Sequence, residues 1–324
     1  METNRQQQPL VSFILTYYNK PVKMLCECID SIVALSLRPY EREIILIDDG
    51  SEISPMNEIM RYGDDIIYLR QKNRGLSIAR NRGIQLASGQ YLQFIDADDM
   101  LNQAAYEHCL DIVRYQKPEM VLFDFSNKPT HGSTFEDSEI MSGTEYMKNR
   151  NIHGTAWGYI FSRSILGTLR FTPSIYHEDE EFTPQLLLHA KQIYSTDAKA
   201  YIYRKHANTI MTKGDRRSKI KRLNDQIYVI KSLRRLLSTM PANEQVAIQR
   251  RIDQLTMNYI YNVILQTRSR HYLDRKLGLL RREGLFPLPD KNYTTKYRWF
   301  RRLTNSDFGL KLLMFAIPLL PKER

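Results

Sequence analysis

Two short apolar runs in this chain end abruptly in clusters of carboxylates, and this pattern constrains the fold more than any other. Residues 43–47 (EIILI) precede the cluster DDGS at 48–51, and residues 91–95 (YLQFI) precede the cluster DADD at 96–99. Such apolar runs are typical of buried strands, where unpaired charge would be very costly. We therefore expect the carboxylates just beyond the ends of two strands, at the edge where open α/β sheets bind ligands.

The first two-thirds of the chain alternates apolar runs with helical patterns. Further strands are predicted at residues 10–16, 66–69, 120–125 and 201–206. Helices are predicted at residues 21–36, 76–87, 100–115 and 182–190. Because strands alternating with helices form βαβ units with right-handed crossovers, we expect an α/β fold with a mostly parallel central sheet flanked by helices.

The DADD cluster suggests a metal site. Asp96 and Asp98 are two positions apart, so their side chains point the same way in an extended chain. Two converging carboxylates suit Mg²⁺ or Mn²⁺, which complete their coordination with water and substrate phosphates. The alternative is a plain strand followed by a turn. For Asp99 we expect a structural role, as the cap of the following helix.

Two neighbouring segments could serve a nucleotide. The DDGS carboxylates could accept hydrogen bonds from a base or ribose, or could form an ordinary turn. The segment NRGLSIARNRG places Arg74, Arg80 and Arg82 around two glycines, and cations of this kind suit a diphosphate. The alternative is a helix with solvated arginines, which we prefer for Arg82. The glycine-rich phosphate motifs GxGxxG and GxxxxGK[ST] are absent from the sequence.

Later segments offer further candidates. Residues 177–182 (HEDEEF) carry four consecutive acids before an apolar helical run, more than a helix N-terminus needs. One of these carboxylates could serve as a general base in a partly closed pocket. The aromatic segment 157–165 could line an acceptor site or pack in the core. His206 follows two cations and could contact metal or phosphate, or be structural.

The charge is unevenly distributed. Residues 216–324 hold 24 Lys and Arg against 8 Asp and Glu, a net charge of +16, whereas residues 1–215 hold 23 against 28, or −5. We therefore divide the chain into a domain at residues 1–212 and a basic helical region at 213–324, which should meet an anionic partner. No nucleic-acid-binding motif accompanies this charge.

The end of the basic region predicts contact with a membrane surface. Residues 296–320 join a basic-aromatic run to an apolar run too short to span a bilayer, which fits an interfacial anchor on anionic lipid. The alternative is a terminal helix packed on the domain. The three cysteines form no disulfide framework, and the polar residues 1–9 resemble no signal peptide. We therefore expect a cytoplasmic protein, peripheral on the cytoplasmic face of the inner membrane.

With these motifs assembled, residues 9–210 resemble the family-2 glycosyltransferases, nucleotide-sugar-dependent enzymes with the GT-A fold. The resemblance rests on VSFILTYYN, on IILIDDGS and on NRGLSIARNRGIQLASGQYLQFIDADD, in this order and spacing. One departure is the loop TYYN, where the family often has a proline before the Tyr-Asn pair.

The resemblance implies roles for particular residues. Those expected beside the nucleotide-sugar are Thr16, Tyr18, Asp48, Asp49, Asn73, Gly75, Arg80, Asp96 and Arg204. Asp98 would be the direct metal ligand, with Asp96 nearer the ribose or sugar and His206 as a further metal contact. Asp179 would be the catalytic base, with Glu178 as a second catalytic residue beside it in the same motif.

The function implied is a metal-dependent inverting glycosyltransferase that uses Mn²⁺ or Mg²⁺. It would move a sugar from a nucleotide-sugar, expected to be a UDP-sugar, to a hydroxyl of a saccharide or lipid-linked glycan during surface polysaccharide synthesis. Two alternatives stay open. One is a non-catalytic nucleotide-sugar-binding module at the membrane. The other is a sugar nucleotidyltransferase, which normally needs a glycine-rich N-terminal loop that residues 11–20 do not supply.

Overall fold

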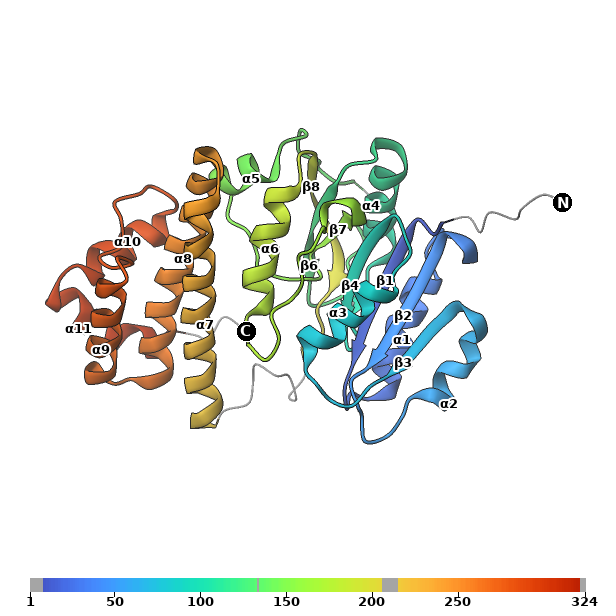
Figure 1. Cartoon of the computed structure of the whole chain (residues 1–324), viewed down its shortest axis with the longest axis horizontal. Coiled ribbons are helices and arrows are strands. Elements are labelled where there is room, and N and C mark those ends of the chain that lie inside the picture. Colours follow the sequence, from blue (N-terminus) through green and yellow to red (C-terminus); the bar gives the residue numbers. More distant parts are fainter. Residues whose placement is uncertain (1–7, 133, 206–214, 321–324) are drawn as a thin grey trace. The chain divides into compact units, whose positions relative to one another are not determined.

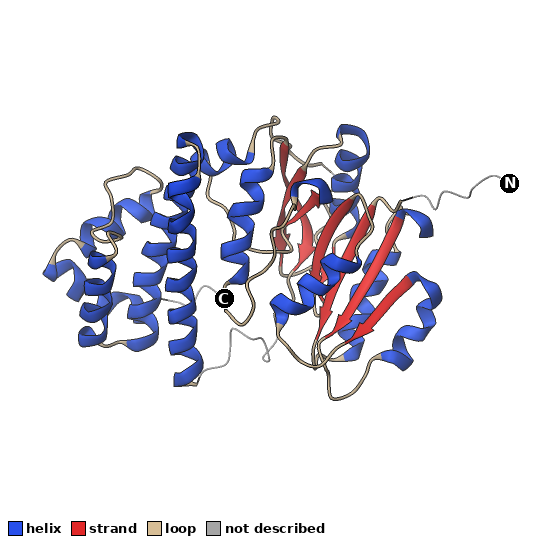
Figure 2. Cartoon of the chain, in the orientation of Figure 1, coloured by secondary structure: helices blue, strands red, loops and turns tan. Residues whose placement is uncertain are grey.

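The computed structural model describes residues 8–132, 134–205 and 215–320, and its backbone contacts divide the chain into two compact units. The first unit comprises residues 1–146 and 153–212 and holds the sheet, and the second comprises 147–152 and 213–324. Figure 2 shows the second unit as helices and loops in its described part. The sequence assigned 147–152 to the first domain, yet these residues group with the second unit.

Two buried arginines of α8 (Ala242–Thr267) hold this short segment in the second unit. Arg250 donates to the carbonyl of Lys148 and, at 3.0 Å, to the side-chain oxygen of Asn151. Arg251 donates to the carbonyl of Ile152 at 3.0 Å. Such contacts depend on three-dimensional proximity, so the sequence pattern did not reveal them.

The first unit is built on one eight-stranded sheet with the order β3-β2-β1-β4-β7-β6-β8-β5 (Figure 1). Its strands are β1 (Val11–Tyr17), β2 (Arg42–Asp48), β3 (Ile66–Arg70), β4 (Tyr91–Asp96), β5 (Met100–Leu101), β6 (Met120–Ser126), β7 (Tyr159–Ser162) and β8 (Ile193–Ile202). The pairs β3–β2, β2–β1, β1–β4 and β6–β8 are parallel, and β4–β7, β7–β6 and β5–β8 are antiparallel. The predicted α/β class is confirmed, with a parallel half and a mixed half.

Helices cover the sheet of the first unit. They are α1 (Val22–Val33), α2 (Met56–Ile59), α3 (Leu76–Leu86), α4 (Gln103–Gln116) and α6 (Glu178–His189), and α5 (Gly143–Asn149) leads into the segment of the second unit. The other helices of the second unit are α7 (Arg216–Leu236), α9 (Arg270–Arg282), α10 (Thr295–Thr304) and α11 (Asp307–Ala316). Within the predicted basic helical region, α8 and α9 are separate helices, because Arg268 adopts a left-handed conformation and Ser269 caps α9.

The alternation of β1 places the sheet between two helical layers. Phe13 and Leu15 belong to the core cluster that includes Leu25 of α1 and Tyr106 of α4. Ile14 points to the other face, where α3 approaches so closely that a Cβ on Gly83 would lie 2.2 Å from the Ile14 side chain. Both faces of β1 are therefore buried, as expected for a central strand with helices on each side.

The prediction that Asp99 caps a helix is wrong. The helix α4 begins at Gln103 with Asn102 in the N-cap position, because residues 100–101 first pair with β8 as strand β5. Asp99 is buried instead and accepts hydrogen bonds from the Tyr201 hydroxyl and the Arg204 backbone N–H, each at 2.8 Å. Burial, and next the charge of Asp96, raise the pKa of Asp99 to about 8. Its structural role is to tie the DADD turn to the end of β8.

Candidate functional site

Strand register brings the two acidic clusters to one edge of the sheet. Thr16, near the end of β1, is aligned with Ile47 of β2 and with Asp96 of β4, and Tyr17 is aligned with Asp48. The neighbouring Tyr18 is exposed at this same edge. The sequence-based expectation that DDGS and DADD share an edge is confirmed by this register, because parallel strands end on the same side of a sheet.

The DDGS carboxylates are buried and bonded to the protein itself. Asp48 accepts from the backbone N–H of Ser51 at 2.8 Å and from the Tyr68 hydroxyl at 3.0 Å. Asp49 accepts from the backbone N–H groups of Arg74 and Gly75, at 2.9 and 2.7 Å. These bonds fix the two loops that follow β2 and β3 against each other.

Two glycines permit this loop arrangement. Gly50 has φ +77°, and a Cβ there would lie 2.6 Å from the backbone nitrogen of Asn73. Gly75 has φ +90° and occupies the N-cap position of α3. Since φ values of this kind are strained for residues with a side chain, both positions favour glycine. The exposed Asn73 thereby lies in the loop directly beside the DDGS turn.

Arg80 of α3 joins the DADD cluster to the acidic start of α6. It is 3% exposed, and its guanidinium donates to Glu178 at 2.7 Å and to Asp96 at 3.0 Å. The same group lies over the Phe171 ring, 5.3 Å from its centre. Burial would lower the pKa of Arg80, but Asp96, Glu178 and Asp179 raise it on balance. The arginine therefore remains a fixed positive charge among carboxylates.

Asp179 lies beside this ion cluster, in the first turn of α6. The sequence placed the start of the helix at residue 182, whereas α6 begins at Glu178 and includes all four acids in its first turn. Burial raises the pKa of Asp179 well above the usual range of an aspartate, and Glu178 and Asp96 raise it further, while Arg80 opposes the shift. A carboxylate of this kind holds a proton more readily than a solvated one, which is the behaviour required of a general base.

Lys20 places a positive charge beside Asp98, the second carboxylate of the predicted metal-binding pair. Lys20, in the loop after β1, lies with its ammonium 2.5 Å from Asp98, and both side chains are largely buried. An ammonium in this position shows that the environment of Asp98 accommodates a positive charge. The described residues contain no group of three or more His, Cys, Asp or Glu side chains able to hold a metal ion. A metal here would use Asp98 and Asp96 and take its other ligands from water and substrate.

Arg204 uses its donors within the protein. Its guanidinium donates to the backbone carbonyls of Asp98 at 2.5 Å and Met24 at 2.8 Å, and to the carboxylate of Glu27 in α1. Arg204 thus ties the DADD turn to α1, in addition to its backbone bond to Asp99. His206 lies outside the described residues.

The aromatic segment packs in the core. Trp157 is 9% exposed and stacks on Tyr201, with ring centres 4.3 Å apart. The Tyr201 hydroxyl in turn accepts from the backbone N–H of Asp96 at 3.1 Å. Of the two roles considered for this segment, core packing is the one observed for Trp157. This packing positions Tyr201, which contacts the start of the DADD turn.

Sequence reasoning missed three residues of this edge. Lys20 and Tyr201 contact the DADD carboxylates, and Glu27 contacts Arg204, which ties the DADD turn to α1. Each of the three stands in an ordinary local pattern: a polar loop, a strand and a helix. The one available signal was Tyr201 itself, a polar-ended aromatic within a predicted buried strand, because a buried Tyr hydroxyl usually needs a partner.

A separate pocket of about 560 Å³ lies at the opposite edge of the sheet, beside Gln90 before β4 and Ser162 at the end of β7. Arg163 and Arg170 line it, and none of the carboxylates described above does. The acidic clusters and the strand ends, and not this pocket, therefore define the candidate site.

Comparison with known proteins agrees with the geometry. Residues 12–166 match the family described as glycosyl transferase family 2. The chain is 28% identical over 221 residues to the glycosyltransferase EpsJ of Bacillus subtilis, an alignment that covers 62% of this chain and 63% of EpsJ. The chain thus spans less than two-thirds of that relative.

Solved structures share the fold. The TarS fragment 1–349 of S. aureus, in complex with UDP-GlcNAc, has a TM-score of 0.58 at 16% identity and covers 91% of each chain. The mannosyltransferase PcManGT of Pyrobaculum calidifontis, in complex with GDP-Man and Mn²⁺, has a TM-score of 0.56 at 13% identity and covers 98% of this chain and 89% of that one.

The central sheet with its helical layers has the GT-A fold, in agreement with the similarity to these solved structures. Together with the family match and the similarity to EpsJ, this fold shows that residues 12–166 form a domain of the glycosyl transferase family 2 type.

Proposed function

We propose that this chain is an inverting glycosyltransferase that moves a sugar from a nucleotide-sugar to a hydroxyl of a saccharide or lipid-linked glycan in surface polysaccharide synthesis. The observation that carries the proposal is the ion cluster around Arg80, which joins Asp96 to Glu178 and lies beside Asp179. Asp96, from the motif proposed to bind the donor, and Glu178, from the motif that holds the proposed base, are thereby bonded to the same guanidinium. Neither the DADD cluster nor the acidic start of α6 could perform the transfer alone.

The donor is proposed to bind over the strand ends, at the edge formed by β1, β2 and β4. Thr16, Tyr18 and Asn73 lie at this edge, and Asp48 and Asp49 shape its loops. A UDP-sugar is the first choice, since TarS, which shares the fold, was solved with UDP-GlcNAc. The buried carboxylates would act through the loops that they hold, while the exposed side chains meet the nucleotide.

Asp98 is proposed as the metal ligand, with Asp96 beside it and His206 as a further candidate. Mn²⁺ or Mg²⁺ bound there would supply positive charge where the departing nucleoside diphosphate develops negative charge. Lys20 would exchange its place at Asp98 for the ion and remain near the diphosphate as a second cation. Arg204, Glu27 and Tyr201 would keep the turn in position during this exchange.

Asp179 is proposed to take the proton from the acceptor hydroxyl. The hydroxyl oxygen then attacks the anomeric carbon from the face opposite the leaving diphosphate, the bond to that diphosphate breaks, and the configuration inverts. Arg80 favours the deprotonated form of Asp179, because its charge lowers the pKa that burial and the neighbouring acids raise. Glu178, bonded to Arg80 at 2.7 Å, is proposed to orient that arginine, while the role of base is proposed for Asp179.

A saccharide or lipid-linked acceptor fits an enzyme at the inner face of a membrane. The supporting observation is the net charge of +16 on residues 216–324, which favours contact with anionic lipid. Within the described residues, no helix is both long enough and apolar enough to cross a bilayer. The proposed association is therefore peripheral.

The proposal is tested with a panel of nucleotide-sugars, including UDP-, GDP- and dTDP-linked donors, offered to the purified protein with Mn²⁺. We expect one donor, a UDP-sugar, to raise the melting temperature and to be hydrolysed slowly to free nucleoside diphosphate. Stabilisation by a donor without diphosphate release, even with crude glycan acceptors, would instead favour the non-catalytic binding module.

Asp98→Asn is expected to weaken Mn²⁺ binding at least by the roughly 10–100-fold that loss of a supporting residue costs a metal site. The reason is that the amide carries no charge for the ion. Binding is measured from the free Mn²⁺ signal in electron paramagnetic resonance, with and without UDP. Asp64→Asn, at an exposed position, serves as the control. Unchanged Mn²⁺ affinity in Asp98→Asn would exclude this ligand assignment.

A further inference from the structure

The last helix of the described chain is apolar on two sides. One side of α11 and the following 3-10 helix (Ile317–Leu319) is buried in the second unit and consists of Gly309, Leu310, Leu313 and Ile317. The other side carries Phe308, Leu312, Phe315 and Leu319, which are 79, 45, 71 and 68% exposed. We call these four residues the outer stripe. Their spacing of four, three and four positions places them along one face of a helix.

The outer stripe does not result from a disordered or loosely attached helix. Gly309 approaches α10 so closely that a Cβ there would lie 2.2 Å from the carbonyl oxygen of Leu303. The side chain of Ser306 caps α11 by accepting from the Gly309 N–H at 3.0 Å. The corner between α10 and α11 is therefore fixed, and it holds the buried side inward and the outer stripe toward solvent. A protein keeps large apolar patches exposed mainly where they meet a partner.

Exposed cations and a tryptophan accompany the stripe. Lys296, Arg298 and Arg302 of α10 and Lys311 of α11 are exposed. Trp299 is 59% exposed, and the Arg302 guanidinium lies 5.5 Å from the centre of its ring. Amphipathic Trp side chains flanked by Lys and Arg are typical of helices that lie in the headgroup layer.

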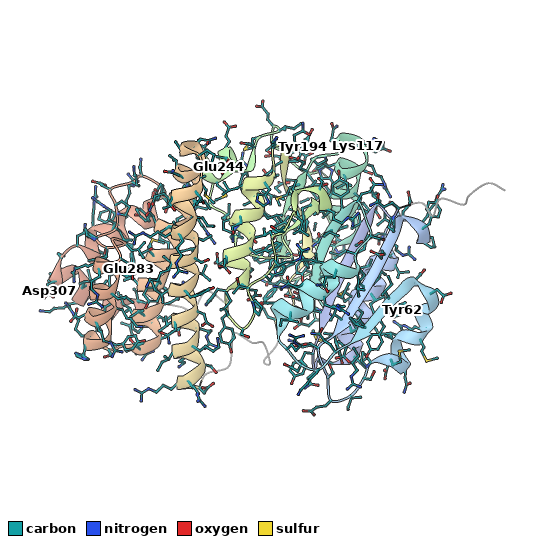
Figure 3. The ribbon with its side chains drawn as sticks, in the orientation of Figure 1. Tyr62, Lys117, Tyr194, Glu244, Glu283 and Asp307 are labelled. Carbon is teal, nitrogen blue, oxygen red and sulfur yellow. The ribbon has the colours of Figure 1, made fainter. Side chains whose placement is uncertain are left out.

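The acidic side chain at the start of α11 does not cancel this charge. Asp307, labelled in Figure 3 where α11 begins, is paired with Arg270 at 2.6 Å and with Lys311 at 3.1 Å. Asp307 thus has two cationic partners, and the excess of Lys and Arg in the whole region remains.

We propose that the outer stripe, with Trp299 and the four cations, is the surface by which this protein lies on an anionic lipid bilayer. The stripe would enter the boundary between headgroups and acyl chains, and the cations would meet lipid phosphates. The proposal deepens the peripheral association proposed above by naming its contact surface, and it does not depend on the identity of the donor.

Charge favours lipid over a second copy of the chain as the occupant. In a two-fold interface the same patch of each copy faces the other, so the cations of the two copies would be brought together. Like charges at an interface disfavour association, whereas an anionic bilayer attracts them.

The test uses the whole protein and vesicles of phosphatidylcholine, with or without phosphatidylglycerol. We expect flotation with the anionic vesicles, weakened by salt, and little flotation with the neutral ones. Of the two tryptophans, Trp157 is buried, so a blue shift of the fluorescence on binding would report Trp299. Changing the outer stripe to serine (Phe308→Ser, Leu312→Ser, Phe315→Ser and Leu319→Ser) should abolish both signals.

Two further variants make the test specific. Glutamine at Lys296, Arg298, Arg302 and Lys311 should weaken partitioning roughly fivefold for each charge removed. As a matched control, serine at four other exposed apolar residues, Ile53, Met60, Tyr115 and Val246, should leave flotation unchanged. Circular dichroism melting and donor-dependent diphosphate release check that each variant is folded and active.

Three results would overturn the proposal: no flotation of the wild type, equal flotation of the outer-stripe variant, or conversion of an oligomer to a monomer by that variant in light scattering. The last result would assign the surface to a second copy. Because flotation is measured without donor or acceptor, failure here is distinguishable from failure of the proposed transfer reaction.

Discussion

Replacing Asp179 by asparagine is expected to lower kcat by about 10²–10⁴-fold while donor affinity stays close to that of the wild type. The amide has nearly the same shape but cannot accept the proton of the acceptor hydroxyl. Donor binding should persist, because Arg80 keeps its bonds to Asp96 and Glu178. Release of nucleoside diphosphate in the presence of acceptor gives kcat, and calorimetry gives donor affinity.

The pH profile of the wild type provides an independent check on Asp179. A general base works when it is deprotonated, so activity should rise with pH through the pKa of Asp179 in the free enzyme. Burial and Glu178 raise that pKa above the ordinary range of an aspartate, which shifts the acid limb of kcat/KM to higher pH. The Asp179→Asn variant should lack this limb.

The neighbouring acid provides the matched control. Glu180 lies in the same first turn of α6, so Glu180→Gln removes one charge from the helix N-terminus while keeping the backbone N–H that donates to Asp179 at 2.8 Å. If the acids serve only the helix dipole, the two variants should behave alike, with small losses of stability. Wild-type turnover by Asp179→Asn would disprove the assignment of the base.

Arg80→Met is expected to lower the free energy of unfolding by about 3–5 kcal/mol, the usual cost of removing one partner from a buried ion pair. The side chain is 3% exposed and neutralises Asp96 and Glu178 directly. Methionine fills most of its volume but leaves these carboxylates without a cation. Urea unfolding at neutral pH measures the loss.

The loss should become smaller on acidification. Without Arg80, Asp96 and Glu178 lose their cation, and Asp179 loses the charge that opposes its raised pKa. At low pH carboxyl groups are neutral in the folded and the unfolded chain alike, so a missing cation then matters less. Arg82→Met is the control, since Arg82 is exposed on the same helix and bonds only Gln85 among the contacts described; its effect should stay within about 0.5 kcal/mol. Equal destabilisation by both variants would contradict the central role of Arg80.

The sequence alone determined the layout of the first unit. Apolar runs of strand length alternated with helical patterns, and this alternation predicted the α/β class and the parallel strands β1 to β4. The acidic clusters DDGS and DADD predicted the edge of the sheet that carries the candidate site, because each cluster directly follows a strand. Burial of a short apolar run is a local property, so these features can be predicted without knowing what any strand packs against.

The tertiary structure decided which side chains meet. Arg80 and Glu178 are 98 residues apart in sequence, and Arg204 and Glu27 are 177 apart. No local pattern encodes such pairs. They follow from the order of the sheet, in which β4 lies between β1 and the antiparallel β7 and the end of β8 reaches the DADD turn.

Asp99 and α11 illustrate the same division. A carboxylate before a helical pattern predicts a cap, but the pairing of β5 with β8 moved the helix start and buried Asp99 against Tyr201. The apolar run of α11 was visible in the sequence, whereas its buried and exposed sides became distinct only when α10 packed against Gly309. Periodicity and composition reflect interactions between near neighbours in the chain, and these the sequence determined. Partners distant in the chain depend on how the elements pack, and only the tertiary structure could decide them.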